Sequence, residues 1–238
     1  MKQRLDQALV VLGLVPTRSQ GESYVKLGHV RVDGKVATKP GQMVSTDNQV
    51  SLLASEQYVS RAGLKLASVA AALNLDFRDK VVLDIGSSTG GFTEYALKHG
   101  AKKVLAVEVG TNQLHPSLQG HAKIELHEKT DIRDFKTTDN IDVVVADLSF
   151  ISLREILPSV ARLSTSQTQI ALMVKPQFEA ANSGLKHKGV IKNDKIRREI
   201  LKDFEVWAQA QFKIIDKADS EVSGAKGNKE RFYLLRKT

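Results

Sequence analysis

The stretch that decides the fold runs Val81-Val82-Leu83-Asp84-Ile85-Gly86-Ser87-Ser88-Thr89-Gly90-Gly91-Phe92-Thr93. An apolar strand ends in an acid, passes through a glycine-rich turn and continues into a helix predicted over 92–98. Glycine lets the backbone approach a ligand closely, and the first turn of a helix presents free N–H groups. The segment therefore predicts a strand–turn–helix unit that binds a nucleotide-like ligand, unless the glycines merely close the turn.

The spacing of these glycines separates two classes of ligand. A dinucleotide site needs G-x-G-x-x-G, whereas this turn has G-x-x-x-G-G, so a dehydrogenase fits poorly. Asp84 would repel a pyrophosphate but suits a cationic amino-acid group. Glu108 ends the next predicted strand, where a carboxylate can bind both hydroxyls of a ribose. The order of acid, glycine loop and acid resembles that of the S-adenosylmethionine methyltransferases.

This resemblance implies that S-adenosylmethionine is the cofactor. Asp131 follows the third strand and is placed to meet the adenine amino group, although a solvated turn residue or a helix cap would show the same pattern. The chain has no cysteine, which excludes disulfides, thiolate zinc sites and cysteine nucleophiles, and no metal site is predicted. The expected cofactor-binding residues are Asp84, Gly86, Ser87, Gly90, Gly91, Phe92, Thr93, Glu108, Asp131 and Ile132.

Residues 61–238 alternate strands with helices. The near-continuous apolar run 143–146 suits a parallel sheet that is covered on both faces. We therefore expect an α/β fold, a Rossmann-like methyltransferase domain with a mostly parallel seven-stranded sheet. The stretch 181–193 is rich in glycine and lysine and is expected to be a mobile loop. Strands are predicted at 80–84, 103–107, 124–128, 141–146, 169–174, 212–217 and 231–236.

Residues 1–60 predict a smaller α+β unit. Helices are expected at 5–14 and 19–27, a hairpin across Asp33-Gly34, and a strand at 49–53. The basic start and the apolar run 8–15 are similar to a short signal peptide, but Asp6 and Gln7 interrupt them and no small-residue cleavage site follows. No apolar run approaches the ~18 residues of a membrane span. We therefore expect a cytoplasmic protein without stable membrane insertion.

Two strand ends bring together residues that could move a proton. Asp147 and Lys175 end neighbouring strands, so both open on the carboxyl edge of the sheet, where ligands of such folds bind. A ribose hydroxyl is a poor nucleophile, and a neutral lysine can take its proton as a methyl group arrives. Taken singly, a charge at a strand end is usually solvated, and Lys65 could be an exposed residue of a helix.

Together, Lys65, Asp147, Lys175 and Glu230 resemble the K–D–K–E tetrad of the FtsJ-like RNA ribose 2′-O-methyltransferases. The resemblance implies that Lys175 takes the 2′-hydroxyl proton during in-line attack on the methyl group. It further implies that Asp147 and Lys65 hold the hydroxyl and Lys175, and that Glu230 orients the lysines.

The N-terminal motifs extend the resemblance to essentially the whole chain. Arg4-Leu5-Asp6, Thr17-Arg18-Ser19, the run 28–34 and Lys39-Pro40-Gly41 resemble the S-four-type (αL) RNA-binding domain. This module followed by an FtsJ-like domain is similar to the TlyA family, whose members are often labelled haemolysins and whose characterised members are ribosomal RNA cytidine 2′-O-methyltransferases. The resemblance implies an RNA-binding domain at 1–60, a methyltransferase domain at 61–238, and ribosomal RNA or ribosomal subunits as partners.

The charge balance agrees with an RNA partner without requiring one. Lys and Arg number 35 against 27 for Asp and Glu, a net charge of +8, which favours a polyanion. We expect Arg4, Arg18, Lys26 and Arg31 to contact RNA phosphates and Phe150 to stack on the target base. A solvated surface is the alternative for the basic residues, since 1–60 carry seven basic and five acidic side chains, and packing is the alternative for Phe150. The stretch 186–202 is either a further RNA contact or an exposed loop and helix face.

Two other functions stay open at this point. One is a membrane-active haemolysin, although no spanning helix or run of barrel-like strands supports it. The other is a ribosome-binding module whose methyltransferase domain is inactive, against which the acids and lysines named above argue.

Overall fold

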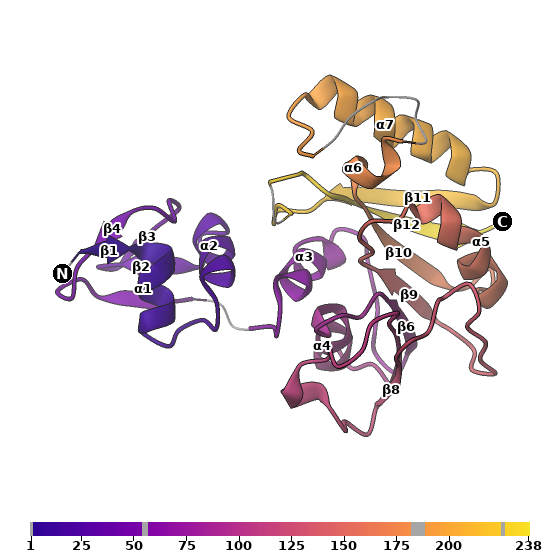
Figure 1. Ribbon diagram of the computed structural model, residues 1–238, viewed down its shortest axis with the longest axis horizontal. Helices are drawn as coiled ribbons and strands as arrows, with labels where there is room; N and C mark the ends of the chain where they lie inside the picture. The colour runs from indigo at the N-terminus through magenta and orange to yellow at the C-terminus, as the bar shows by residue number, and fades with distance from the viewer. Residues whose placement is uncertain (1, 54–56, 182–188, 225–226) are drawn as a thin grey trace.

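A seven-stranded sheet forms the centre of the larger region (Figure 1). The computed structural model describes residues 2–53, 57–181, 189–224 and 227–238. The strand order is β11-β12-β10-β9-β6-β7-β8. Six of these strands run in one direction, and β12 runs in the opposite direction. The predicted mostly parallel sheet is therefore confirmed. Its strands are β6 (Val81–Ile85), β7 (Lys103–Val107), β8 (Ile124–His127), β9 (Val143–Ala146), β10 (Gln169–Val174), β11 (Phe212–Asp219) and β12 (Arg231–Lys237).

Alternate residues of the central strands enter two separate cores. In β9, Val143 and Val145 belong to one buried cluster, whereas Val144 and Ala146 belong to the other. Because successive side chains of a strand point to opposite faces, this alternation shows that helices cover both faces of the sheet. Burial on both faces explains why the residues of β9 are all apolar, as the sequence predicted.

Helices from different parts of the chain cover the two faces (Figure 1). α3 (Arg61–Ala70) and α4 (Gly91–Lys98) pack on one face, and α5 (Leu153–Leu163) and α7 (Asp194–Ala208) pack on the other. The short α6 (Pro176–Glu179) directly follows β10 and contacts α7. A 3₁₀ turn at Pro116–Leu118 lies between β7 and β8.

The chain order of the sheet reverses between β6 and β9. From β6 the chain moves outward through β7 and β8, and it then returns to place β9 on the other side of β6. The pairing brings Ile85 opposite Val107 on one side and opposite Ala146 on the other. Ligands of open α/β sheets bind beyond the carboxyl ends of the strands at such a point. The topology therefore places a binding site beside the glycine-rich turn.

The glycine-rich turn also serves the packing of two helices. Gly90 adopts a left-handed conformation (φ +88°) immediately before α4. A Cβ on Gly91 would lie 2.3 Å from Oγ of Ser60 and 2.8 Å from the backbone nitrogen of Gly63. Gly91 therefore allows α4 to approach the start of α3, and any larger residue would push the two helices apart.

The N-terminal region contains two helices and two small sheets. The predicted hairpin is confirmed, because Asp33 (φ +50°) and Gly34 (φ +75°) form the left-handed turn between β2 and β3. The first helix ends at Val11, earlier than expected, because Gly13 (φ +67°) turns the chain. The elements are β1 (Gln3–Arg4), α1 (Leu5–Val11), α2 (Arg18–Lys26), β2 (Val30–Val32), β3 (Lys35–Val36), β4 (Met43–Val44) and β5 (Val50–Leu52).

The smaller region lies beside α3 (Figure 1). The side chain of Gln20 in α2 donates a 2.8 Å hydrogen bond to the backbone oxygen of Tyr58, and α2 also contacts α3. Throughout the described ranges, no helix is both long enough and apolar enough to cross a bilayer. The loop predicted at 181–193 cannot be compared in full, since 182–188 lie outside the described residues.

Candidate active site

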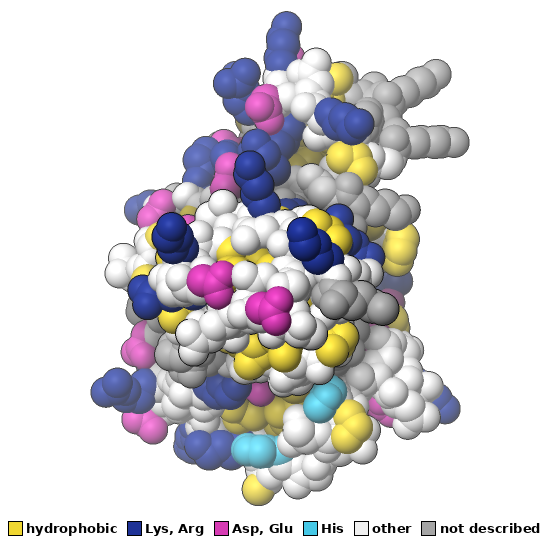
Figure 2. All heavy atoms as spheres, turned by 90° about the vertical axis from the view of Figure 1, so that its left-hand side faces the viewer, with side chains coloured by type: hydrophobic (Ala, Val, Ile, Leu, Met, Phe, Trp, Pro, Cys, Tyr) yellow, Lys and Arg dark blue, Asp and Glu magenta, His cyan; other side chains and the backbone are white. Residues whose placement is uncertain are grey.

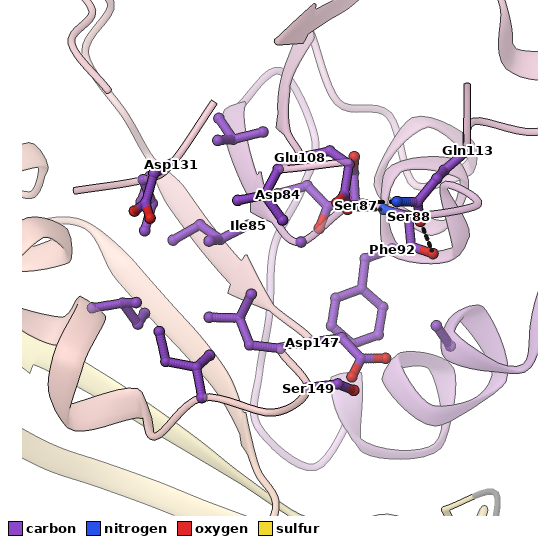
Figure 3. A pocket seen from close by; sticks show the side chains of 18 of the residues that line it. Asp84, Ile85, Ser87, Ser88, Phe92, Glu108, Gln113, Asp131, Asp147 and Ser149 are labelled. Atoms are coloured by element: carbon purple, nitrogen blue, oxygen red, sulfur yellow. Dashed lines mark hydrogen bonds between the residues drawn. The ribbon is translucent and has the colours of Figure 1, made fainter. Parts of the chain in front are cut away.

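A cavity of about 560 Å³ opens beyond the carboxyl ends of β6, β7, β9 and β10 (Figure 3). Its volume is in the range of small-molecule sites. Three strand-end loops supply the predicted cofactor residues that line it, and the loops after β9 and β10 supply predicted RNA and catalytic residues. The lining includes Asp84, Gly86, Ser87, Phe92, Glu108, Asp131 and Ile132 together with Asp147, Phe150 and Lys175.

Asp84 is a buried carboxylate with one unsatisfied oxygen. Its Oδ2 accepts a 2.6 Å hydrogen bond from the hydroxyl of Thr93, while Oδ1 has no hydrogen-bond partner among the described residues. Burial raises the pKa of Asp84 to about 7, and the charges of Asp147 and Glu108 add to this effect, which Thr93 opposes. A cationic group at Oδ1 would stabilise the ionised form. Asp84 therefore suits the amino group of an amino-acid-like ligand.

Glu108 joins two loops that border the cavity. Its carboxylate accepts hydrogen bonds from the backbone nitrogens of Ser88 (2.9 Å) and Gly110 (2.8 Å) and a longer one from Gln113 Nε2 (3.3 Å). Figure 3 shows Glu108 beside Ser87, Ser88 and Gln113. A carboxylate has about four acceptor positions, so these three hydrogen bonds leave about one position for a ribose hydroxyl. A second hydroxyl could donate to Glu108 only in place of the long hydrogen bond from Gln113.

Asp131 lines the cavity and is also held in a turn. Its carboxylate accepts hydrogen bonds from the backbone nitrogen and from the guanidinium of Arg133, which holds its pKa below the usual range. Ile132 beside it is buried and gives the cavity an apolar wall. Asp131 is therefore a turn residue that also lines the cavity, and its expected contact with an adenine amino group stays a prediction.

Three predicted cofactor residues are outside the described lining of the cavity. Gly90 and Gly91 belong to the packing of α4 described above, and Thr93 acts on the site through its hydrogen bond to Asp84. Gly86 does line the cavity, and a Cβ there would meet the side chain of Leu148 at 2.7 Å. The glycines of the turn therefore differ in their roles, which their spacing alone could not reveal.

The four residues of the tetrad form two ion pairs. Lys175 Nζ lies 2.5 Å from Asp147 Oδ1 and donates a 2.8 Å hydrogen bond to Ser149 Oγ, at the edge of the cavity. Lys65 Nζ lies 2.5 Å from Glu230 Oε2, between α3 and the residue before β12. Of the two described pairs, only Asp147 and Lys175 line the cavity.

Both pairs are removed from water to a large extent. The side chain of Lys175 is 9% exposed, and those of Lys65 and Glu230 are 8% and 3% exposed. The interpretation of Lys65 as an exposed helix residue is therefore wrong. A buried charge is costly unless it is paired, so each lysine depends on its carboxylate partner. Sequence alone could not show this dependence, because the partners are 165 and 28 residues apart.

Two residues that sequence reasoning missed contribute to the site. Ser149 accepts the hydrogen bond from Lys175, and Gln113 contacts both Glu108 and the hydroxyl of Ser88. Ser149 could have been found, because it follows Asp147 by two residues in the same strand-end loop. No pattern in the sequence distinguishes Gln113, which reaches the cavity from the segment after β7.

Phe150 stands out of the surface at the mouth of the cavity. It is 90% exposed and has a left-handed backbone (φ +68°), which is unfavourable for a bulky side chain. Its ring lies 5.4 Å from that of Phe178, centre to centre. Phe150 is therefore not a core residue, and it offers an aromatic face next to Lys175.

The predicted RNA-binding residues occupy a mixed surface. Arg4 and Arg18 both bind the fully buried carboxylate of Asp6, at 2.8 and 3.0 Å. Lys26 pairs with Glu22 along α2, and Arg31 is exposed on β2. Figure 2 shows lysine and arginine side chains spread over this end of the molecule, with acidic side chains between them. Asp6 was not foreseen as a functional residue, yet it orients two of the four predicted contacts.

The second basic stretch, 186–202, divides in the structure. Residues 186–188 lie outside the described ranges. Arg197 in α7 is buried and binds Asp219 at 2.7 Å, so it belongs to the fold rather than to a binding surface. Lys192, Lys195 and Lys202 are exposed.

The sheet order, the cavity at the point of reversal and the paired acids at β6 and β7 define a Rossmann-like methyltransferase. The model of the FtsJ-like methyltransferase family matches residues 58–237, and that of the S4 domain matches residues 3–50. The chain therefore belongs to the FtsJ-like methyltransferases, and within them to the TlyA family, in which an S4 domain precedes the methyltransferase domain.

Individual relatives agree with this assignment. The chain is 41% identical over 196 residues to the 23S rRNA (cytidine-2'-O)-methyltransferase TlyA of Campylobacter jejuni, covering 82% of this chain and 77% of the relative. It is 36% identical over 233 residues to Hemolysin A of Brachyspira hyodysenteriae, covering 95% and 97%. A solved structure, "Putative hemolysin from Streptococcus thermophilus", superimposes with a TM-score of 0.72 at 35% identity, covering 100% of this chain and 89% of that one.

Proposed function

We propose that this protein transfers a methyl group from S-adenosylmethionine to a ribose 2′-hydroxyl of cytidine in ribosomal RNA. The observation that carries the proposal is the buried Lys175–Asp147 pair at the edge of a cavity whose other walls suit the cofactor. The name of the Campylobacter jejuni relative, a 23S rRNA (cytidine-2'-O)-methyltransferase, supports both the base and the type of RNA. Since ribosomal subunits are cytoplasmic, we place the protein in the cytoplasm.

The cofactor fits the residues that are present. The unsatisfied Oδ1 of Asp84 would hold its amino group, Glu108 would accept hydrogen bonds from its ribose, and Ile132 and Asp131 would border its adenine. When bound, S-adenosylmethionine supplies an electrophilic methyl group on a sulfonium ion. The fit rests on the chemistry of these side chains and on the size of the cavity.

The chain's own residues would position and deprotonate the hydroxyl. Asp147 and Ser149 hold Lys175 Nζ at the edge of the cavity, at 2.5 and 2.8 Å. Lys175 in its neutral form would accept the 2′-hydroxyl proton while the hydroxyl oxygen attacks the methyl group and the bond from that methyl group to sulfur breaks, which leaves a neutral thioether. Such positioning and general-base help account for large rate effects, of about 10²–10⁴-fold for proton transfer alone. Lys65 and Glu230 would support the site as a second buried pair outside the lining of the cavity.

The RNA would be held by the smaller region and by the mouth of the cavity. Arg4, Arg18, Lys26 and Arg31 would contact phosphates, which fixes the position of the RNA without reading its sequence. Phe150 would stack on the target base, for which its exposed ring next to Lys175 is suited. We propose the domain boundary at residues 60 and 61, where Ser60 precedes the first residue of α3.

The test is incubation of purified protein with ribosomal subunits and labelled S-adenosylmethionine, followed by mapping of the modified nucleotide. We expect label at a ribose of the RNA with the wild-type protein, none with Lys175→Met, and wild-type labelling with Lys102→Met, which alters an exposed lysine before β7, at the edge of the sheet opposite the cavity. Cofactor binding without methylation by the wild type would favour an inactive domain. Leakage of liposomes at the same protein concentration would favour a haemolysin.

A further inference from the structure

A buried carboxylate outside the tetrad holds the loop that carries Asp147, Ser149 and Phe150. Glu179, the last residue of α6, is 1% exposed, and burial raises its pKa. Its Oε2 accepts a 2.6 Å hydrogen bond from Ser152 Oγ, and its Oε1 accepts a 2.8 Å hydrogen bond from the backbone nitrogen of Leu153. The tetrad does not use this group, and the cofactor cavity does not include it.

The partners of Glu179 lie where the loop after β9 becomes α5. Ser152 is the residue before α5, and Leu153 is its first residue. A free backbone N–H and a hydroxyl at a helix start need acceptors when they are buried. Glu179 supplies both acceptors from a different segment, the one that follows β10. It therefore fastens the far end of the loop 147–152 to the chain that carries Lys175.

The near end of the same loop is also held from the β10–α6 segment. Lys175 binds Asp147 and Ser149, and the ring of Phe178 contacts the ring of Phe150. Lys175, Phe178 and Glu179 lie within five consecutive residues. One short stretch therefore contacts the loop 147–152 at three points. Such contacts are needed because Phe150 has an unfavourable φ, and a strained conformation persists only when its surroundings fix it.

We propose that Glu179 is a positioning residue, which fixes the loop 147–152 against α6 and so holds Asp147, Ser149 and Phe150 in place around Lys175 and the target nucleotide. The proposal rests on the proposed function for its effect on rate, but the fixing of the loop can be measured without it. Arg154 supports the arrangement from outside, since its guanidinium lies 3.6 Å from Glu179 and also binds Asp203 at 2.5 Å.

The experiment compares Glu179→Ala with Glu179→Gln and with Glu155→Ala, a control on an exposed residue of α5. Alanine removes both acceptors. Glutamine keeps one acceptor but can keep both contacts, because its carbonyl oxygen can accept from the backbone nitrogen of Leu153 and its amide can donate to Ser152 Oγ once that hydroxyl rotates. Single-turnover methylation, cofactor affinity by calorimetry, and hydrogen exchange of the segment 147–153 are measured for each protein.

In Glu179→Ala we expect a rate lower by about 10–100-fold, the size of effect that misplacing reacting groups by about 1 Å produces. We also expect faster exchange in 147–153 and a cofactor affinity that falls by less than the rate, because residues 147–151 line the cavity whereas Asp84 and Glu108 lie on other loops. Glu179→Gln and Glu155→Ala should behave as wild type. If Glu179→Ala does not fold, Ser152→Ala should show the same pattern more weakly, since it removes one of the two contacts together with the cap that Ser152 Oγ gives the backbone nitrogen of Arg154.

Unchanged exchange in 147–153 of Glu179→Ala would overturn the proposal. A loss of cofactor affinity in parallel with the rate would also overturn it, since that is the mark of general destabilisation. So would a glutamine variant as slow as the alanine variant. Absence of methylation by the wild type would instead refute the proposed function, and the exchange measurement would still decide whether Glu179 holds the loop.

Discussion

Replacement of Asp84 with asparagine should stabilise the cofactor-free protein at neutral and alkaline pH. Asp84 is wholly buried, and its pKa is about 7 in the folded chain against 3.8 for the free side chain. A pKa raised on folding means that the unfolded chain loses its proton first, so stability is lost as pH rises between these two values. The full difference of roughly 3 pKa units corresponds to about 4 kcal/mol.

The size of the effect depends on the pH range of the measurement. At pH 5 the unfolded chain is already mostly ionised at this position, so about 2–3 kcal/mol of the loss falls between pH 5 and pH 8. Asparagine does not titrate, and its carbonyl can still accept the hydrogen bond of Thr93. The variant should therefore be more stable than wild type by an amount that grows with pH.

The assay is urea unfolding of both proteins at four pH values from 5 to 8, without cofactor. Asp131→Asn is the matched control. Arg133 lowers the pKa of Asp131, so the change in the free energy of unfolding caused by this substitution should be the same at all four pH values. Cofactor should bind wild type more tightly as pH rises through 7 and should bind Asp84→Asn weakly at every pH. Parallel stability profiles for wild type and Asp84→Asn would refute the reasoning, because Asp84 would then titrate alike in both states.

Three further predictions concern binding and chemistry. Glu108→Ala should weaken cofactor binding by about 1–3 kcal/mol, since buried donors lose their acceptor, and unchanged affinity in calorimetry would place the ribose elsewhere. Lys175→Arg should keep cofactor and RNA affinity but lose at least about 10²-fold in methylation rate, because arginine stays charged; near-normal turnover on saturating subunits would exclude Lys175 as the base. Lys26→Gln and Arg31→Gln should each lower the salt slope of RNA binding by about 0.7–0.9, whereas Arg4→Gln should also lower stability in urea unfolding, because it takes a partner from the buried Asp6.

The sheet could be predicted from sequence because its strands carry a strong local signal. The bounds of β7 and β10 agree with those predicted, and the other strands differ by a few residues at their ends. Strands of two residues, such as β1 and β4, are too short to give such a signal. They form because the rest of the fold brings distant residues together, for example Gln3 opposite Val44, 41 positions later.

The candidate site was predictable where its residues follow strands. Asp84, Glu108, Asp147 and Lys175 all end strands on one edge of the sheet, and the structure brings them to one cavity. Glu179 and Gln113 could not be found in this way, because each acts through contacts with a loop that is distant in sequence. Their roles depend on tertiary packing, which no local pattern in the chain encodes.

The position of β12 between β10 and β11 has a consequence for synthesis of the chain. β12 is made after every other strand of its sheet, yet it fills an interior place, pairing with β10 on one side and β11 on the other. Until it leaves the ribosome, the nascent chain exposes an unpaired edge of the apolar strand β10, which is a risk for aggregation. Lys65 also lacks Glu230 until then, so the protein can assemble its second ion pair only once translation has passed the last loop.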